Sequence, residues 1–420
     1  MKCFEWRLFI VFAVVGCLST GSLAEQVLTW HDVREKFQAN NPTLLAGRIE
    51  IEATRAQEIT AYLRPNPTFT ALMDQLHPWK TTGAFHDALP VASLEYLLER
   101  RHKRQLRLES AKKETAIAIS QLEDEERDLL FTLRSAFLQV LQEKAILALA
   151  RENLSYYDRV LQVSHDRLKA GDIARIDLDR LELQRVTLES DLQTADVNLR
   201  TAKIQLLMLL NDRTPVEQLD VTGPFDFFDL MIPLEELRRT ALEARPDLRA
   251  AVQSIDQART NFRLAEANGS TDPTVGVDFG RNTGFEPGYE TYIGLSLSIP
   301  LRIFDRNQGE RLRTKLDIGR NEKVRDAAEA LVLSDVNSAY ATLASALILL
   351  RPYKAQYLQQ AVTVRDTVTF SYERGGASLL DFLQAQNDYR NVQRNYLTLV
   401  GSYLSAAAQL NFAVGREVIQ

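Results

Sequence analysis

The sequence presents one series of landmarks twice, and this internal duplication constrains the fold more than any other feature. The segment RLKAGDIARIDLDRLE at 167–182 aligns with SYERGGASLLDFLQAQ at 371–386. Three pairs of residues share the offset 375 − 171 = 204: Gly171 and Gly375, Asp177 and Asp381, and Pro42 and Pro246. A constant offset near half the chain length indicates two copies of one structural unit. We therefore predict a first repeat at 25–225 and a second at 226–420.

Each repeat is predicted to begin with a helix that ends at a proline step. The expected helices cover 33–63 and 234–267. Asn66-Pro67 follows the first helix and Asp272-Pro273 follows the second. The residue before a proline disfavours the helical region of backbone space, so a helix stops there and an extended segment follows.

Alternation of apolar with small residues predicts a β-hairpin after each opening helix. In the second repeat, 274–280 and 289–301 flank RNTGFEPG, a loop rich in turn-forming residues. In the first repeat, 68–73 and 89–97 flank the longer loop DQLHPWKTTGAFHDA. The last strand carries the clearest apolar set, on one face: Ile293, Leu295, Leu297 and Ile299.

After each hairpin the apolar period changes from 2 to 3.5 residues, which is the heptad period of coiled coils. From Leu133, apolar residues recur at every seventh position: Val140, Leu147, Leu154, Leu161 and Leu168. Outgoing and returning helices are expected in pairs: 101–169 with 176–210, and 311–374 with 379–414. The first of them would be about 100 Å long. Pro352 should kink the outgoing helix of the second repeat.

The first residues, MKCFEWRLFIVFAVVGCLSTGSLAEQ, have the order of a secretion signal, in which basic residues precede an apolar run and small residues. Two cleavage sites compete for this signal. Cleavage after Ala24 would remove 1–24, whereas the lipobox-like VVGC predicts removal of 1–16 and lipidation of Cys17. Cys3 and Cys17 are the 2 cysteines of the chain, so we expect neither a disulfide framework nor a thiolate zinc site.

Composition and motifs argue against several classes of function. The net charge of -6 gives no basic excess for nucleic acid, and the mean hydropathy of -0.20 argues against many membrane helices. The sequence has no nucleophile elbow, phosphate loop or dinucleotide fingerprint, so neither an enzyme nor a cofactor is expected. None of the histidines has a ligand partner at recognised metal spacing: His31, His77, His86, His102 and His165. His77 and His86 share one loop, which is either a weak surface metal contact or a plain exposed loop.

An exported chain with two strand hairpins and two long helical hairpins raises a problem of closure. Four strands cannot close a barrel, and open strand edges are not tolerated in lipid. Three copies would supply twelve antiparallel strands, an even number found in outer-membrane barrels. We therefore predict an α+β membrane protein with a trimeric barrel. Lipid would contact the apolar set of the last strand: Ile293, Leu295, Leu297 and Ile299.

Several segments resemble the TolC-like outer-membrane efflux proteins, and the resemblance extends over most of the chain. They are LRPNPTF at 63–69, ALEARPDL at 241–248, SIPLRIFDRNQGERLR at 298–313 and LLDFLQAQNDY at 379–389. The resemblance implies a homotrimer with a twelve-stranded β-barrel in the outer membrane and a long periplasmic barrel of helices. It also implies a passive conduit with two partners, a periplasmic adaptor (membrane fusion protein) and an inner-membrane efflux pump. The basic segment 94–111 resembles the heavy-metal and drug efflux branches, which leaves metal cations and organic drugs open as cargo.

Asp177 and Asp381 are the candidate periplasmic gate, because each lies six residues after a glycine at a predicted helical tip. In a trimer they would form rings of carboxylates, which favour cations and can hold a gate through ion pairs. The alternative is that each aspartate stabilises the first turn of its helix through the helix dipole. The gate pattern of the family has a further aspartate three residues after the second of these, where this chain has Gln384.

The predicted tips contain glycines that end helices and that would, in this family, dock the adaptor: Gly171, Gly375 and Gly376. Arg175 and Arg374 are candidate partners for the tip carboxylates, unless they belong to solvated helix faces. The alternative function is a periplasmic coiled-coil structural or adaptor protein. Strand alternation argues against a plain rod, and no series of β-rich modules flanks a single hairpin as in an adaptor.

Overall fold

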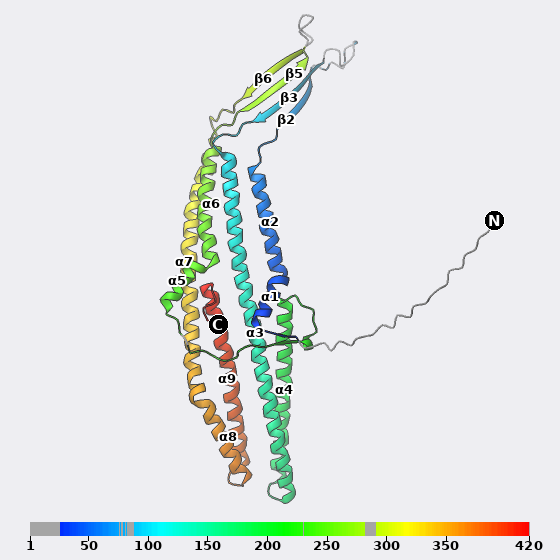
Figure 1. The fold of residues 1–420 in the computed structure, drawn as a ribbon, viewed down its shortest axis with the longest axis vertical. Helices are drawn as coiled ribbons and strands as arrows, with labels where there is room; N and C mark the ends of the chain where they lie inside the picture. The colour runs from blue at the N-terminus through cyan, green and yellow to red at the C-terminus, as the bar shows by residue number, and fades with distance from the viewer. Residues whose placement is uncertain are drawn as a thin grey trace, which may run out of the picture.

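The computed structural model describes residues 26–74, 76, 79, 81, 88–229, 231–281 and 291–419. The predicted signal peptide at 1–24, its alternative at 1–16, Cys17, His77 and His86 lie outside these residues. A small sheet occupies one end of the molecule, and long helices extend from it to two turns at the opposite end (Figure 1).

The sheet confirms both predicted hairpins and joins them. β2 (Thr68–Asp74) pairs with β3 (Leu89–Leu97), and β5 (Thr274–Arg281) pairs with β6 (Thr291–Ser298), all antiparallel. The central contact between β3 and β5 gives the strand order β2-β3-β5-β6. β6 ends before Ile299-Pro300, since proline has no amide hydrogen for the ladder. Each strand hairpin is therefore local in sequence, whereas the sheet is not.

The prediction of one opening helix per repeat is wrong, because each of these helices is broken in two. α1 (Trp30–Asn40) is followed by α2 (Pro42–Tyr62), and α5 (Leu234–Ala244) by α6 (Pro246–Asn268). Asn41 and Arg245 at the breaks are extended, with ψ of 120° and 123°. Both residues precede a proline, which disfavours the helical region for them, while the proline itself suits the first position of a new helix.

The long helical hairpins follow the heptad prediction closely. In the first, α3 (Lys103–Ala170, 68 residues) turns into α4 (Arg175–Leu209). In the second, α7 (Gln308–Pro352) and α8 (Leu358–Glu373) run out, and α9 (Leu379–Val414) returns. Between α7 and α8 the backbone is π-helical over Tyr353–Tyr357, directly after Pro352. α8 leaves the direction of α7 there, which confirms the predicted kink (Figure 1).

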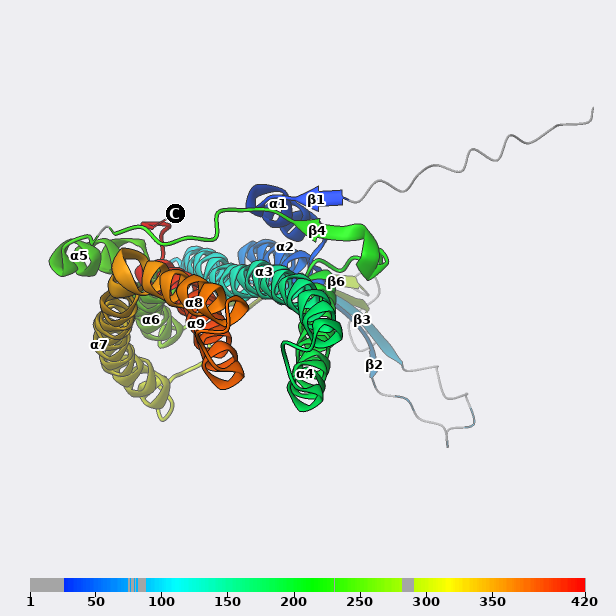
Figure 2. The ribbon, with the colours of Figure 1, turned by 90° about the horizontal axis from the view of Figure 1, so that it is seen from below.

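The helices form a curved layer with additional small elements on its convex side. Viewed along the helices, α7 and α4 lie at the two ends of an open arc, and α1, α5, β1 (Gln26–Leu28) and β4 (Leu219–Val221) lie outside it (Figure 2). β1 and β4 pair in parallel, which the sequence analysis did not predict because each strand has only 3 residues. This shape is that of a wall segment with a belt of small elements around its middle.

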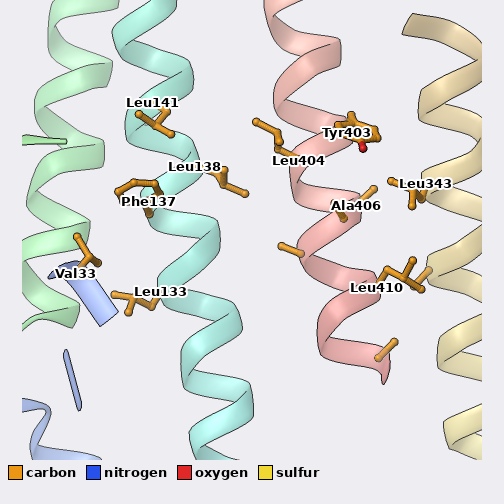
Figure 3. Packing of buried hydrophobic residues seen from close by; sticks show 14 of the residues in the cluster. Val33, Leu133, Phe137, Leu138, Leu141, Leu343, Tyr403, Leu404, Ala406 and Leu410 are labelled. Atoms are coloured by element: carbon orange, nitrogen blue, oxygen red, sulfur yellow. The ribbon is translucent and has the colours of Figure 1, made fainter. Parts of the chain in front are cut away.

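The apolar core lies between the helices of this layer. Leu138 of α3 points toward Leu404 of α9, and Leu343 of α7 lies beside Ala406 of α9 (Figure 3). Val33 of α1 covers the other side of α3. Two segments, Gln308–Glu373 and Leu379–Val414, contain apolar windows of mean hydropathy 1.3, and 56% of the second window is buried within the protein. We attribute these windows to the packing contacts between neighbouring helices of the layer, since α7 and α8 both pack on α9.

Candidate functional site

One face of the sheet is apolar across all four strands. Paired residues in a sheet point to the same face, and the register places Phe69 opposite Leu94, Leu94 opposite Val277, and Val277 opposite Leu295. The same face carries further apolar residues from every strand: Ala71, Met73, Ala92, Val275, Phe279, Ile293 and Leu297. In the single chain this face is uncovered.

The predicted lipid-facing residues lie on this face. Ile293, Leu295 and Leu297 are 73%, 85% and 64% exposed. Ile299 is also exposed, but it follows the end of β6. These exposed side chains are contiguous with the other apolar residues of the face, and an apolar patch of this kind requires a cover that one chain does not supply.

The opposite face of the sheet carries small and polar residues. Its members are Thr70, Ser93, Glu95, Gly276, Asp278, Gly294 and Ser296. Leu72, Val91 and Tyr292 are exceptions that form one rank near the hairpin ends of the strands, and Leu89 and Leu97 at the two ends of β3 are also apolar. The sheet is therefore apolar on one face and mainly polar on the other.

β2 and β6 are the edges of this sheet, and each pairs on one side only within the described residues. Their outer backbone amides and carbonyls therefore have no ladder partner in one chain. A sheet with two open edges and one apolar face is stable in a membrane only when other chains close it.

The two helical tips have the same backbone geometry. Gly171 ends α3 with φ of 83°, and Gly375 follows α8 with φ of 76°. The next amide in each tip reaches back over the turn: Asp172 donates to the carbonyl of Arg167 at 2.9 Å, and Gly376 to that of Ser371 at 2.8 Å. Both are Schellman turns, which need a residue in the left-handed region. The predicted helix ends at Gly171 and Gly375 are confirmed.

Gly376 has a different role from the one expected for it. Its φ does not lie in the left-handed region, so it is not the residue that reverses the chain. A Cβ at this position would lie 2.9 Å from Ser371 Oγ. Gly376 is therefore small because the backbone passes close to the preceding turn.

Asp177 and Asp381 occupy the same position, the third residue of a returning helix. The carboxylate of Asp381 accepts from the Ser378 amide at 3.1 Å and from the Ser378 hydroxyl at 2.7 Å. These hydrogen bonds from Ser378 lower the pKa of Asp381. Ala174 precedes the first helix instead of a serine, and Asp177 lies 4.0 Å from Arg180. Asp381 is thus part of a capping box, and Asp177 is not.

Of the two alternatives left open for Arg175 and Arg374, the single chain does not show pairing with Asp177 or Asp381. Arg175 Nε donates to Asp179 at 2.8 Å, because residues four apart face each other on a helix. The Arg374 guanidinium lies 3.4 Å from the centre of the Phe370 ring. Gln384, at the position where the family pattern has an aspartate, donates to Asp388 at 2.8 Å.

Two contacts that the sequence analysis missed join the helical hairpins near their tips. Arg167 of α3 donates to the Tyr372 carbonyl at 3.2 Å, and its guanidinium lies 5.2 Å from the centre of the Tyr372 ring. The Tyr372 ring in turn stacks on Phe382 of α9, with centroids 4.8 Å apart. Apolar residues of α3, α4, α8 and α9 surround this stack.

Gln386 makes the second contact between the hairpins. Its amide donates to Tyr156 Oη of α3 at 3.3 Å and to Thr369 Oγ1 of α8 at 3.1 Å. Gln386 is buried, one turn after the buried Phe382. A polar residue within an apolar helix stripe is the sequence signal that could have revealed it, since a buried amide needs partners.

The described residues contain no group of three or more His, Cys, Asp or Glu side chains that could hold a metal ion. His31 lies 3.2 Å from Glu35, and His165 lies 3.6 Å from Glu182. These are isolated surface pairs of one histidine and one carboxylate each. Neither has the three or four ligands of a zinc site.

Comparisons with known proteins agree on one type of molecule. The family model described as "Outer membrane efflux protein" matches residues 33–212 and 237–416. The cobalt-zinc-cadmium resistance protein CzcC of Cupriavidus metallidurans is 24% identical over 382 residues, which are 90% of this chain and 87% of CzcC. A crystal structure of CusC, from work on its folding and transmembrane channel formation, has a TM-score of 0.78 at 16% identity, over 92% of each chain. The open state of the MtrE outer membrane channel of Neisseria gonorrhoeae has a TM-score of 0.75 at 19% identity, over 95% of this chain and 94% of MtrE.

Proposed function

The chain belongs to the outer membrane efflux protein family, and from this premise we propose that three copies form the outer-membrane channel of a tripartite efflux system. The family match covers most of the described residues, and the curved helical layer below the sheet is the periplasmic part of such a channel. The channel would be passive, with energy supplied by an inner-membrane pump. A plain coiled-coil rod or an adaptor would not need a sheet of this kind.

The observation that carries the proposal is the four-stranded sheet with one apolar face and two open edges. Three such sheets, joined from β6 of one copy to β2 of the next, give a closed barrel of twelve strands. Ile293, Leu295 and Leu297 would then contact outer-membrane lipid, with Ile299 at the lower margin. The small and polar face would line the lumen. Closure would satisfy the edge amides, and insertion into the outer membrane would cover the apolar face with lipid.

The helical tips are the proposed docking surface for a periplasmic adaptor. The Schellman turns at Gly171 and Gly375, with the neighbouring Gly376, expose short backbone loops at the end of the molecule farthest from the sheet (Figure 1). We propose that the adaptor binds them and links the channel to the pump.

We propose metal cations as the cargo. CzcC is named for cobalt, zinc and cadmium resistance, and its similarity covers 90% of this chain. A wide water-filled lumen selects weakly, so the inner-membrane pump would choose the ion. Deletion of the corresponding gene should lower growth at elevated zinc, cobalt or cadmium. Unchanged metal tolerance together with sensitivity to organic drugs would assign the other cargo class.

The tips are also the proposed gate. Asp177 and Asp381 would form carboxylate rings near the closed end, and the Arg167 contact with Tyr372 would hold the hairpins together. In planar bilayers, Asp381→Asn and Asp177→Asn should each raise the basal conductance. Ser378→Ala is the matched control, because it removes the cap and leaves the Asp381 carboxylate. If Ser378→Ala opens the channel as much as Asp381→Asn, capping and not the acidic ring holds the tips closed.

Membrane fractionation with a native mass measurement tests the assembly directly. We expect a trimer that is recovered with the outer membrane and resists extraction by high salt. A monomer in the soluble periplasmic fraction would reject the channel and leave the alternative of a coiled-coil structural protein.

A further inference from the structure

A polar cavity lies between the two helical hairpins, on the sheet side of the tips. Its volume is about 110 Å³, and its walls come from α3, α4 and α9. Asn153 and Tyr157 line it from α3, Gln184 from α4, and Gln384, Asn387 and Arg390 from α9. A volume of this size holds a few water-sized occupants.

Two buried donors in this cavity have no hydrogen-bond partner. Tyr157 is 3% exposed, and its hydroxyl has no acceptor within the described residues. The Nε of Arg390 is likewise buried and unpartnered, although the other end of the guanidinium donates to Asn387 at 2.7 Å. Burial raises the pKa of Tyr157 and lowers the pKa of Arg390. Buried polar groups are normally satisfied, so both donors point to an occupant that accepts hydrogen bonds.

The charge of the cavity decides which occupant fits. Arg390 is the one charged residue among the lining residues, and the others are amides, a phenol and leucines. The carboxylates close by in sequence are engaged elsewhere: Asp388 accepts from Gln384 at 2.8 Å, and Asp158 accepts from Arg185 at 2.6 Å. Asp191 of α4 attracts the Arg390 guanidinium, but it does not line the cavity. The guanidinium is partly buried and has no carboxylate partner in the cavity itself, so an anion there would supply one.

Gln384 is one of the five amide side chains that line the cavity where carboxylates could stand. It lines the cavity on the same helix as Arg390, and it carries a neutral amide where a glutamate could place an anionic group. The replacement of the family's aspartate by Gln384 therefore affects this cavity, separately from any effect on a ring of carboxylates at the tips.

We propose that the cavity binds a small monovalent anion, of the chloride or nitrate class, between the Tyr157 hydroxyl and the Arg390 Nε. The anion would join α3 to α9, beside the contacts that Arg167 and Gln386 already make between the hairpins. Because opening would separate these hairpins, the bound anion stabilises the closed tips. This role in closure rests on the proposed channel function, whereas the binding itself does not.

Diffraction from the full-length protein, crystallised in sodium bromide, tests the binding. We expect an anomalous peak in the cavity between Tyr157 and Arg390. A cavity that holds only water, with no anomalous peak, would overturn the proposal. A protein that is not a trimer yet shows the peak would reject the channel function and keep the anion site, so the two failures can be told apart.

Thermal unfolding gives the second test, with sodium chloride compared with sodium gluconate at equal ionic strength. We expect chloride to raise the unfolding midpoint of the parent protein, since a ligand that binds only the folded state stabilises it. Tyr157→Phe and Arg390→Gln should lose this shift, and Gln384→Glu should lose it as well, because its own carboxylate would take the place of the anion. Arg394→Gln, an exposed arginine one turn further along α9, is the control and should keep the shift. An equal chloride shift in the parent and in Arg390→Gln would overturn the proposal.

Discussion

The first and the second helical hairpin end in the same turn, but their outgoing helices differ. α3 is one continuous helix of 68 residues, whereas its counterpart is interrupted at Pro352 and passes through π-helical Tyr353–Tyr357. Both nevertheless end in the same turn, at Gly171 and Gly375. The comparison shows that the turn is set by a local backbone requirement, and that the rod leading to it can be straight or bent.

The breaks between the two short helices of each repeat, at Asn41 and at the equivalent Arg245, also differ in what stabilises them. Asn41 caps α2 by accepting from the amides of Thr43 and Leu44 at 3.0 and 3.1 Å. Its counterpart Arg245 instead donates to Asp247 and Asp335, at 2.7 and 2.8 Å, while only 3% exposed. The two repeats therefore keep the break before proline but hold it by hydrogen bonding in one case and by a buried ion pair in the other.

The largest expected difference lies at these breaks. Arg245→Ala leaves two partly buried carboxylates without their partner and should cost about 3 kcal/mol of unfolding free energy. Asn41→Ala removes only a helix cap and should cost about 1 kcal/mol. Denaturant unfolding of the detergent-solubilised protein measures both. Equal losses would contradict the assignment of Arg245 as the stronger link.

The second difference lies in the apolar cluster near the tips. Phe382 and Leu178 are equivalent positions, and both are 0% exposed. Phe382→Ala should cost about 4 kcal/mol, since a larger cavity is left and the stack on Tyr372 is lost. Leu178→Ala should cost about 3 kcal/mol. Unfolding midpoints measure both losses, and we expect the lower midpoint for Phe382→Ala. A lower midpoint for Leu178→Ala would show that the first tip depends more on its buried side chain.

The third difference is the residue before each returning helix, which is Ser378 in the second tip and Ala174 in the first. Each can be replaced by the other's residue type. Ser378→Ala removes a capping box and should cost about 1 kcal/mol. Ala174→Ser should stabilise α4 by a similar or smaller amount, because it places a cap three residues before Asp177. Hydrogen exchange of the first turns of α4 and α9 follows each helix separately. Faster exchange at the first turn of α4 in Ala174→Ser would contradict the equivalence of the two positions.

The smallest expected effect is a pH dependence at the second tip. The pKa of Asp381 is lowered in the folded state by its bonds from Ser378, so its contribution is present above the pKa of the unfolded chain. It is lost as the pH falls below about 4 and through the folded value. The protection of the amides at the start of α9, taken relative to the intrinsic exchange rate at each pH, should therefore fall in acid in the parent protein. In Ser378→Ala this loss of protection should shrink.

Local patterns predicted most of the elements. The heptads predicted α3, the alternation predicted all four strands of the main sheet, and the glycines predicted the turns. Helix breaks at Asn41 and Arg245 were missed even though both precede a proline, because the apolar period runs on across the break. β1 and β4 were missed because strands of three residues are too short to show an alternation of apolar and polar side chains.

The sequence by itself determined the two-fold order of helices, hairpins and turns, since these depend on periodicity and on residues with special backbone preferences. Only the tertiary structure decided which distant residues meet. It placed β3 beside β5, Arg167 against Tyr372, and Arg390 in a cavity with Tyr157. A side chain's partner across the helical layer depends on the rotation and stagger of whole helices, and no local pattern records these.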